Sequence, residues 1–222
     1  MTARISARRR RINSNPVSVL LLLCAALAAS VARGQEAGSA QQEQAAAAAP
    51  VTVLVSTTLG DIHVALEQQR APITVANFLR YVDGKRFDNS SIYRAVKVDT
   101  EGNYGLVQGG LKGDTKKLFK PIAHESPAVT GLSHLDGTIS MARTDPGTAT
   151  ADFFFVVGDL LALDGKSDGS DPGYAAFGHV TQGMEILKQV LLAPRSEDMG
   201  DGSMKGQMLA APVKILSIRR LD

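Results

Sequence analysis

The chain has 222 residues, of which 44% are hydrophobic and 21% are charged, with 21 Gly and 9 Pro. This composition is typical of a turn-rich globular protein, and it excludes a coiled coil, a collagen-like chain and a wholly disordered chain. The single cysteine, Cys24, excludes an intrachain disulfide scaffold and a zinc site built from several cysteines.

The formal net charge of +2 depends on the first 32 residues, which contain arginines but no acidic residue. The whole chain has 24 Lys and Arg; subtracting the arginines at 4, 8, 9, 10 and 11 leaves 19, against 22 Asp and Glu. A nucleic-acid-binding surface needs excess positive charge to neutralise phosphates. We therefore expect no nucleic-acid partner.

Residues 1–32 have the pattern of an export signal, with an arginine-rich start, an apolar run from Pro16 to Ala32, and small residues suited to cleavage. The run is at the short limit for crossing a bilayer. We expect a cleaved signal peptide, an exported, periplasmic protein and no stable membrane insertion after cleavage; a retained anchor is the alternative. Residues 33–50 are small and polar and predict a disordered Gln/Ala-rich tether.

The folded domain is expected from residue 51 to residue 222. Residues 51–57 are rich in β-branched side chains, and residues 62–66 alternate between apolar and other side chains, which predicts a β-hairpin. A helix is predicted from Pro72, where apolar residues recur at helical spacing, to a C-terminal cap at Gly84.

Further short β-rich segments follow, at residues 91–96, 106–108, 138–142, 153–157, 176–180 and 213–218. A second helical pattern covers residues 184–192. Many short strands with two helices favour an antiparallel sandwich or barrel over a doubly wound α/β sheet.

Common catalytic and metal motifs are missing: there is no GxSxG nucleophile elbow, no HExxH, no P-loop and no GxGxxG after a strand. Two histidines, His124 and His134, have acidic neighbours at Glu125 and Asp136. Neither pair has a second ligand at a recognised spacing, so we interpret both as surface and turn hydrogen bonding.

Asp164, Asp168 and Asp171 lie in the glycine-rich segment LDGKSDGSDPGY. Their spacing is not that of an EF-hand loop, which favours a solvated hairpin tip over a calcium site. We expect no metal and no other cofactor.

A set of short strings in fixed order resembles the cyclophilin family of peptidyl-prolyl cis-trans isomerases, and in particular its exported bacterial members. The strings are IYRAV (92–96), LVQGG (106–110), GTISMAR (137–143), PGTATADFFFVV (146–157), LDG (163–165) and YAAFGHVTQGMEIL (174–187). The resemblance covers residues 51–222. It implies a mainly β fold, a closed eight-stranded antiparallel barrel capped by two α-helices.

The resemblance also implies the chemistry. Rotation about an X-Pro bond needs a donor that meets the prolyl nitrogen in the twisted state, together with a pocket for the ring. Arginine suits this role because its charge is permanent and its fork is rigid. By resemblance the catalytic residue is Arg94; a strand arginine in a surface ion pair is the alternative.

The remaining site residues are assigned by resemblance to substrate binding. Gln108 lies beneath the substrate, Phe154 forms the floor of the proline pocket, and the backbone of Ala142 and Arg143 binds the extended peptide. The other matches are Leu106, Leu163 and Tyr174. Strand alternation places Phe153 and Phe155 on the side opposite Phe154.

Three positions depart from the family pattern. The connection KVDTEGNYG is about six residues longer than usual, and Gly105 replaces a pocket phenylalanine, which makes Tyr104 a possible substitute. Asp152 replaces a glutamine and can pair with Arg94, either fixing it or sequestering it. Ala162 replaces an aromatic wall residue.

The leading interpretation is an exported, monomeric isomerase that acts on unfolded or extended proline-containing polypeptides. The alternative is a weakened module of the same fold that only binds proline-containing peptides or a partner protein. An unrelated β-barrel hydrolase or metal protein would need a nucleophile or ligand set that the sequence does not present.

Overall fold

The computed structural model describes residues 51–221. The predicted signal peptide (1–32) with Cys24, the predicted tether (33–50) and Asp222 lie outside the described residues. Within residues 51–221, no helix has both the length and the apolar character needed to cross a membrane.

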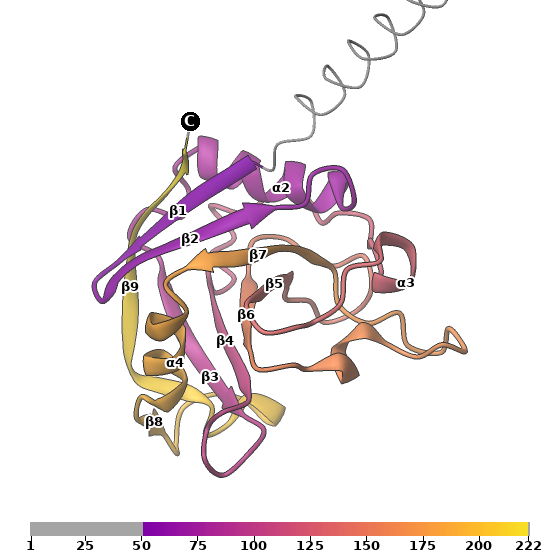
Figure 1. Ribbon diagram of the computed structural model, residues 1–222. Helices are drawn as coiled ribbons and strands as arrows, with labels where there is room; N and C mark the ends of the chain where they lie inside the picture. The colour runs from indigo at the N-terminus through magenta and orange to yellow at the C-terminus, as the bar shows by residue number, and fades with distance from the viewer. Residues whose placement is uncertain (1–50, 222) are drawn as a thin grey trace, which may run out of the picture. The chain divides into compact units, whose positions relative to one another are not determined.

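The described residues form a closed antiparallel barrel, shown in Figure 1. The sheet order is β1-β2-β7-β5-β6-β4-β3-β9-β8, and β1 also pairs with β9, which closes the barrel through eight of the strands. The strands are β1 (Val51–Thr57), β2 (Gly60–Leu66), β3 (Ser91–Lys97), β4 (Gly105–Gly110), β5 (Thr138–Met141), β6 (Phe153–Val157), β7 (Ala176–Gln182), β8 (Arg195–Ser196) and β9 (Met208–Leu221). The predicted eight-stranded barrel is confirmed.

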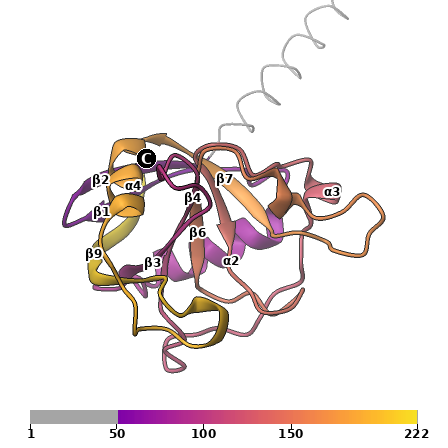
Figure 2. The same ribbon diagram turned by 90° about the horizontal axis from the view of Figure 1, so that it is seen from below.

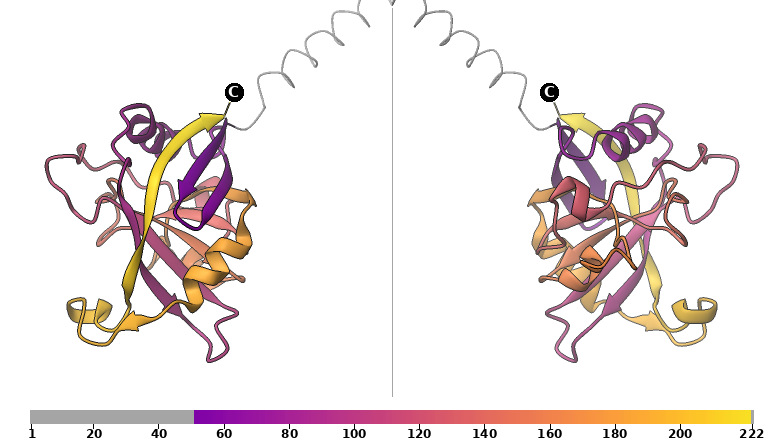
Figure 3. Two further views of the ribbon diagram at one scale, coloured as in Figure 1. Left: turned by 90° about the vertical axis from the view of Figure 1, so that its left-hand side faces the viewer. Right: turned by 90° about the vertical axis from the view of Figure 1, so that its right-hand side faces the viewer.

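Strand β9 is longer than the predicted residues 213–218. Its first part pairs with β3 and the two-residue strand β8, and its second part pairs with β1, so that it runs along the barrel wall in Figure 3. The sequence Met208–Pro212 lacks apolar alternation and contains a proline, which explains why its strand character was missed. Pro212 is tolerated because it occupies an exposed position in the strand.

Two helices pack against the barrel as predicted. Helix α2 (Pro72–Asp83) and helix α4 (Met184–Leu192) both contribute side chains to the main core. A four-residue helix, α3 (Pro127–Thr130), and two 3₁₀ helices, η1 (Leu161–Asp164) and η2 (Gly202–Met204), were not predicted, since such short turns lack a detectable period.

The N-terminus of α2 is capped from a distant part of the chain. No side chain at Ala71 caps it; instead the buried carboxylate of Glu125 accepts hydrogen bonds from the N–H groups of Ile73 (3.1 Å) and Thr74 (2.7 Å). The hydroxyl of Thr74 donates to the same carboxylate (2.6 Å). A negative charge at a helix N-terminus is favourable, so Glu125 fixes the 111–126 segment to α2.

The barrel interior contains several packed aromatic side chains. Phe78 of α2 packs edge-on against Phe153 of β6, with ring centroids 5.5 Å apart, and Phe153 packs against Phe155 at 5.6 Å. Both β6 phenylalanines are fully buried in the core, whereas Phe154 is not part of it. Strand alternation therefore sends Phe154 to the other face, as predicted.

Candidate active site

One cavity of about 610 Å³ gathers the predicted site residues, with the single exception of Tyr104. Its volume falls in the range of small-ligand sites. Its lining consists of Tyr93, Arg94, Leu106, Gln108, Lys112, Ala142, Arg143, Thr144, Thr148, Thr150, Asp152, Phe154, Leu163, Tyr174, Met199, Gly200, Asp201, Met204 and Met208. The side chains come from the outward faces of β3, β4 and β6 and from the loops beside them.

The guanidinium of Arg94 is held by two neutral carboxamides. Nη1 donates to Oε1 of Gln108 (2.7 Å), while Nε and Nη2 both donate to Oε1 of Gln207 (2.9 and 2.5 Å). Among the described residues, no carboxylate forms an ion pair with Arg94. Burial lowers the pKa of Arg94 from its usual value, but an arginine remains protonated at neutral pH. Its positive charge is therefore not neutralised by a neighbouring acid.

Gln108 links Arg94 to the buried side of the site. Its Nε2 donates to the hydroxyl of Tyr93 (2.8 Å), which requires that its Oε1 faces the arginine. Burial raises the pKa of the Tyr93 phenol well above its usual value, so this hydroxyl stays protonated. Gln108 thus lies beside Arg94 in the cavity wall, with Tyr93 as a supporting residue that the sequence did not indicate.

Phe154 forms an apolar surface in the cavity. Its ring meets Tyr174 edge-on at 5.5 Å and lies nearly parallel to His134 at 6.0 Å. The Tyr174 ring in turn lies under the guanidinium of Arg143, 4.6 Å from its centroid. Phe154 is therefore held by two aromatic neighbours.

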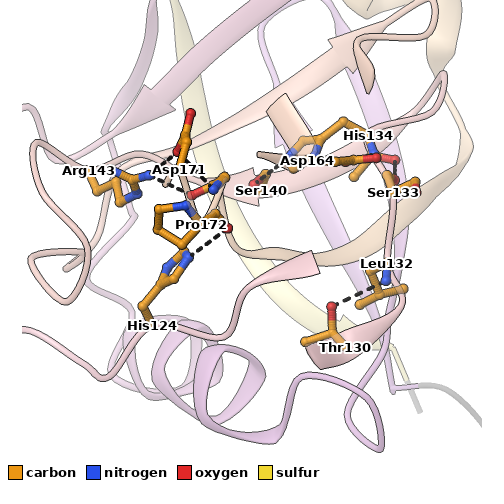
Figure 4. Close-up of polar contacts among 12 residues, drawn as sticks. His124, Thr130, Leu132, Ser133, His134, Ser140, Arg143, Asp164, Asp171 and Pro172 are labelled. Carbon is orange, nitrogen blue, oxygen red and sulfur yellow. Dashed lines mark hydrogen bonds and ion pairs between the residues drawn. The ribbon is translucent and has the colours of Figure 1, made fainter. Parts of the chain in front are cut away.

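Arg143 contacts the segment that precedes Tyr174, and Figure 4 shows its side chain directed at Asp171. Nη2 of Arg143 donates to the carbonyl of Gly173 (2.6 Å) and lies 3.8 Å from Asp171. The N–H of Ala142 donates to the carbonyl of Asp152 (2.9 Å). The backbone carbonyl of Ala142 is therefore the group that can accept a hydrogen bond from a bound peptide.

Asp152 lines the cavity but does not pair with Arg94, which corrects the predicted ion pair. Its Oδ1 accepts the N–H of Lys112 (2.9 Å), in the turn that follows β4. Burial raises the pKa of Asp152 above its usual value, and the backbone N–H of Lys112 opposes this shift. The carboxylate therefore fixes a turn, and the arginine takes its partners from Gln108 and Gln207.

Tyr104 lies outside the cavity, and the expected substitution for the missing pocket phenylalanine does not occur. Its ring packs beside Gly158 and is 48% exposed. A Cβ at Gly105 would collide with the carbonyl of Val96, so this position has no room for a pocket side chain. Asp99 accepts backbone N–H groups of residues 102–104, which keeps the long loop folded at the far end of β3 and β4.

A polar chain that the sequence did not predict packs against Phe154 through the ring of His134. Figure 4 shows its three members, His134, Asp164 and Ser140. Nδ1 of His134 lies 2.6 Å from Oδ1 of Asp164, and Nε2 lies 2.9 Å from Oγ of Ser140. Although the residue types are those of a hydrolytic triad, His134 and Ser140 are fully buried and do not line the cavity. They support the pocket, and the predicted surface role of His134 is wrong.

The other acidic and histidine candidates serve local structure. His124 contacts the carbonyl of Pro172 (3.4 Å), and Asp168 and Asp171 accept N–H groups within their own turn. Asp164 is different, because it binds His134 and is not part of a solvated tip. In residues 51–221, no group of three or more His, Cys, Asp or Glu side chains is arranged to hold a metal ion.

Sequence reasoning missed one whole wall of the cavity, formed by residues 199–208. The side chains that line this wall include Met199, Met204 and Met208. The side chain of Gln207, in the same segment, accepts hydrogen bonds from Arg94. In Figure 2 this segment, which follows α4 and leads into β9 in the chain, projects below β3 in dark gold. No short motif marks it, because a loop rich in glycine and methionine has no period and its partners are about one hundred residues away in the chain.

Comparison with known proteins agrees with this arrangement. The sequence model of the family described as "Cyclophilin type peptidyl-prolyl cis-trans isomerase/CLD" matches residues 52–219. Peptidyl-prolyl cis-trans isomerase A of Dickeya dadantii is 36% identical over 139 residues, covering 62% of this chain and 70% of the relative. A peptidyl-prolyl cis-trans isomerase of Acinetobacter baylyi is 31% identical over 168 residues, covering 75% and 84%.

The fold is also similar to that of solved structures. A cyclophilin type peptidyl-prolyl cis-trans isomerase of Cryptosporidium parvum, determined in the presence of the dipeptide Ala-Pro, superposes with a TM-score of 0.61 at 21% identity. The superposition covers 77% of this chain and 99% of that chain. At this identity the similarity concerns the fold alone.

Proposed function

Since this chain belongs to the cyclophilin-type peptidyl-prolyl cis-trans isomerase family, and is therefore an isomerase of X-Pro peptide bonds, we propose that Arg94 is its catalytic residue. We further propose that its substrates are extended or unfolded proline-containing segments of exported proteins. The assignment of Arg94 rests on one observation. Its guanidinium faces the cavity while two neutral carboxamides hold it and no described carboxylate neutralises it.

The chemistry requires no covalent step. Rotation about an X-Pro bond faces a barrier of about 18–20 kcal/mol because the twisted amide loses resonance. In the twisted state the prolyl nitrogen regains a lone pair, which can accept a hydrogen bond that the planar amide does not accept. An N–H of Arg94 directed at this nitrogen stabilises the transition state more than the ground state, and therefore raises kcat.

The apolar part of the cavity holds the proline ring during the rotation. Phe154, with Leu106 and Leu163, offers the surface on which the ring packs. The carbonyl of Ala142 binds the peptide on one side of the proline. The ring then stays fixed while the acyl side turns, which lowers the entropic cost of the rotation.

Isomerisation of a proline-containing peptide by the full chain tests this function. Exchange between cis and trans is measured by NMR with and without the protein, alongside proline-limited refolding of a model protein. We expect both to be faster with the protein. Peptide binding without faster exchange would contradict the catalytic role and favour the alternative of a binding module.

We propose that the chain is exported, with residues 1–32 removed as a signal peptide, residues 33–50 acting as a tether and residues 51–222 forming a monomeric isomerase domain. The support is the arginine-rich start and apolar run in the sequence. The intact mass of the exported protein tests it: a mass that retains Cys24 would contradict cleavage. Light scattering of the same sample tests the monomer.

A further inference from the structure

In the cavity wall, Arg94 is held by a residue from a loop that is distant in the chain. Oε1 of Gln207 accepts from both Nε and Nη2 of Arg94, and Gln108 accepts from Nη1. Since a guanidinium has five N–H bonds, these three contacts leave one N–H on each terminal nitrogen. The guanidinium plane is thus fixed at two points and retains donors for a ligand.

The carboxamide of Gln207 is itself oriented. Its Nε2 donates to the carbonyl of Ser203 (2.8 Å), and a backbone carbonyl can only accept. The amide oxygen must therefore face Arg94, which can only donate. A rotated amide would break both contacts at once, so the surroundings select one orientation.

The backbone of Gln207 is tied to the same strand as the arginine. Its carbonyl accepts the N–H of Ala95 (3.0 Å), and the next residue, Met208, is the register partner of Arg94 in β9. The register shifts between Ile92 and Arg94, which marks an irregularity in the strand at this point. Gln207 therefore sits in a fixed place relative to the arginine before any substrate binds.

We propose that Gln207 is a positioning residue for the isomerase reaction, which orients Arg94 through its side-chain oxygen. This inference rests on the proposed role of Arg94. Glutamine fits the task because it holds the arginine by two hydrogen bonds without neutralising its charge. The charge and the remaining donors then stay available to the twisted amide.

The test compares Gln207→Leu with Gln207→Glu in the full chain. Leucine has a similar size but no acceptor, so the guanidinium loses its fixed plane; we expect kcat to fall by about one to two orders of magnitude. The KM should stay within about twofold because Phe154 still binds the proline ring. Glutamate keeps the acceptor oxygen and should recover part of the lost kcat.

A spectroscopic measurement separates positioning from general structure. The Nε–H signal of Arg94 in a ¹⁵N NMR spectrum should be protected from solvent exchange in the wild type and in Gln207→Glu, but not in Gln207→Leu. Lys205→Ala, an exposed position of the same loop outside the cavity, is the matched control and should behave as wild type.

The inference is overturned if Gln207→Leu keeps a kcat within about twofold of wild type, or if its Arg94 signal remains protected. It is also overturned if the Arg94 signal is equally unprotected in Gln207→Leu and Gln207→Glu, since the acceptor oxygen would then be irrelevant to the position of the guanidinium. The Arg94 signal needs no substrate. An inactive wild type with a protected signal would therefore count against the catalytic role of Arg94 and not against its positioning.

Discussion

Nδ1 of His134 lies 2.6 Å from Oδ1 of Asp164, in a place where the histidine has no contact with solvent. A carboxylate can only accept, so Nδ1 carries the proton. Because burial lowers the pKa of His134, the imidazole is neutral at neutral pH, and Nε2 then accepts from the hydroxyl of Ser140. Because its ring stacks on Phe154, the neutral form is part of the support of the proline pocket.

The buried, neutral His134 predicts that the stability of the folded protein depends on pH. Burial lowers the pKa of His134 below its usual 6.5, although Asp164 opposes the shift. Below pH 6.5 the unfolded chain takes up a proton that the folded chain does not, so the free energy of unfolding decreases by at most about 1.4 kcal/mol per pH unit. Urea unfolding between pH 7.5 and 5 measures this.

The matched variant for that experiment is His134→Asn, which retains a donor but does not titrate. Other groups titrate equally in both proteins, so the difference between the two pH profiles isolates the histidine. Parallel profiles for the wild type and His134→Asn would show that His134 does not titrate in this range.

The cap of α2 predicts a loss of stability when Glu125 is removed. Its carboxylate accepts two helix N–H groups and the hydroxyl of Thr74, all of which would be unpaired in Glu125→Ala. We expect the free energy of unfolding to fall by about 2 kcal/mol or more. Glu101→Ala, an exposed acidic position, should change it by about 0.5 kcal/mol or less. Equal effects of the two variants would refute the cap.

Asp152 is predicted to matter for folding and little for catalysis. Because its Oδ1 holds the N–H of Lys112 and does not contact Arg94, Asp152→Asn should keep kcat/KM within about threefold. Asp152→Ala leaves that N–H unpaired and should cost about 1–3 kcal/mol of stability. A tenfold change in kcat for Asp152→Asn would indicate that the carboxylate acts on Arg94 in the substrate complex.

The methionine wall predicts a preference for apolar substrates. Met199 and Met204 line the cavity beside Arg94 and are 40% and 36% exposed, so a substrate side chain can cover them. Methionines adapt to differently shaped apolar groups. We expect the double variant Met199→Ala, Met204→Ala to raise KM about threefold or more for peptides with a large apolar residue next to proline.

The comparison series uses peptides with alanine at that position, whose KM should not change. Leu216→Ala, an exposed leucine on β9 outside the cavity, controls for the loss of apolar surface in general. If the double variant affects both peptide series equally, the wall does not bind that side chain.

Most strands and both long helices could be predicted from local rules, which left a sandwich or a barrel open, and the family resemblance implied the closed barrel. Strand alternation predicts that Phe154 faces the opposite side from Phe153 and Phe155, as observed. The helical spacing of apolar residues predicts a helix over residues 184–192, which are the bounds of α4. The cavity residues were assigned by resemblance to the family and not from local rules. The matching strings lie within strands or close to them, and Leu163 lies in η1.

The remaining parts depend on contacts between distant residues. Glu125 caps a helix from 51 residues away, and Gln207 reaches Arg94 across 113 positions. The pairing expected between Asp152 and Arg94 fails because a backbone N–H in the next turn is the nearer partner. Tertiary geometry decides which partner each of these groups binds. Local patterns in a single sequence do not predict that geometry.

The central claim is that Arg94 accelerates the rotation itself. Arg94→Ala should lower kcat for cis-trans exchange by about two orders of magnitude or more, which corresponds to about 2.7 kcal/mol of barrier. Arg94→Lys should recover little, because a point charge does not replace the planar fork. Arg86→Ala, on the surface away from the cavity, is the control.

The most direct measurement is therefore NMR exchange spectroscopy on a proline-containing peptide, with wild type and Arg94→Ala compared at equal occupancy of the site. The account predicts that both proteins bind the peptide and that only the wild type exchanges its cis and trans forms rapidly. Equal exchange rates for the two proteins at equal occupancy would contradict it.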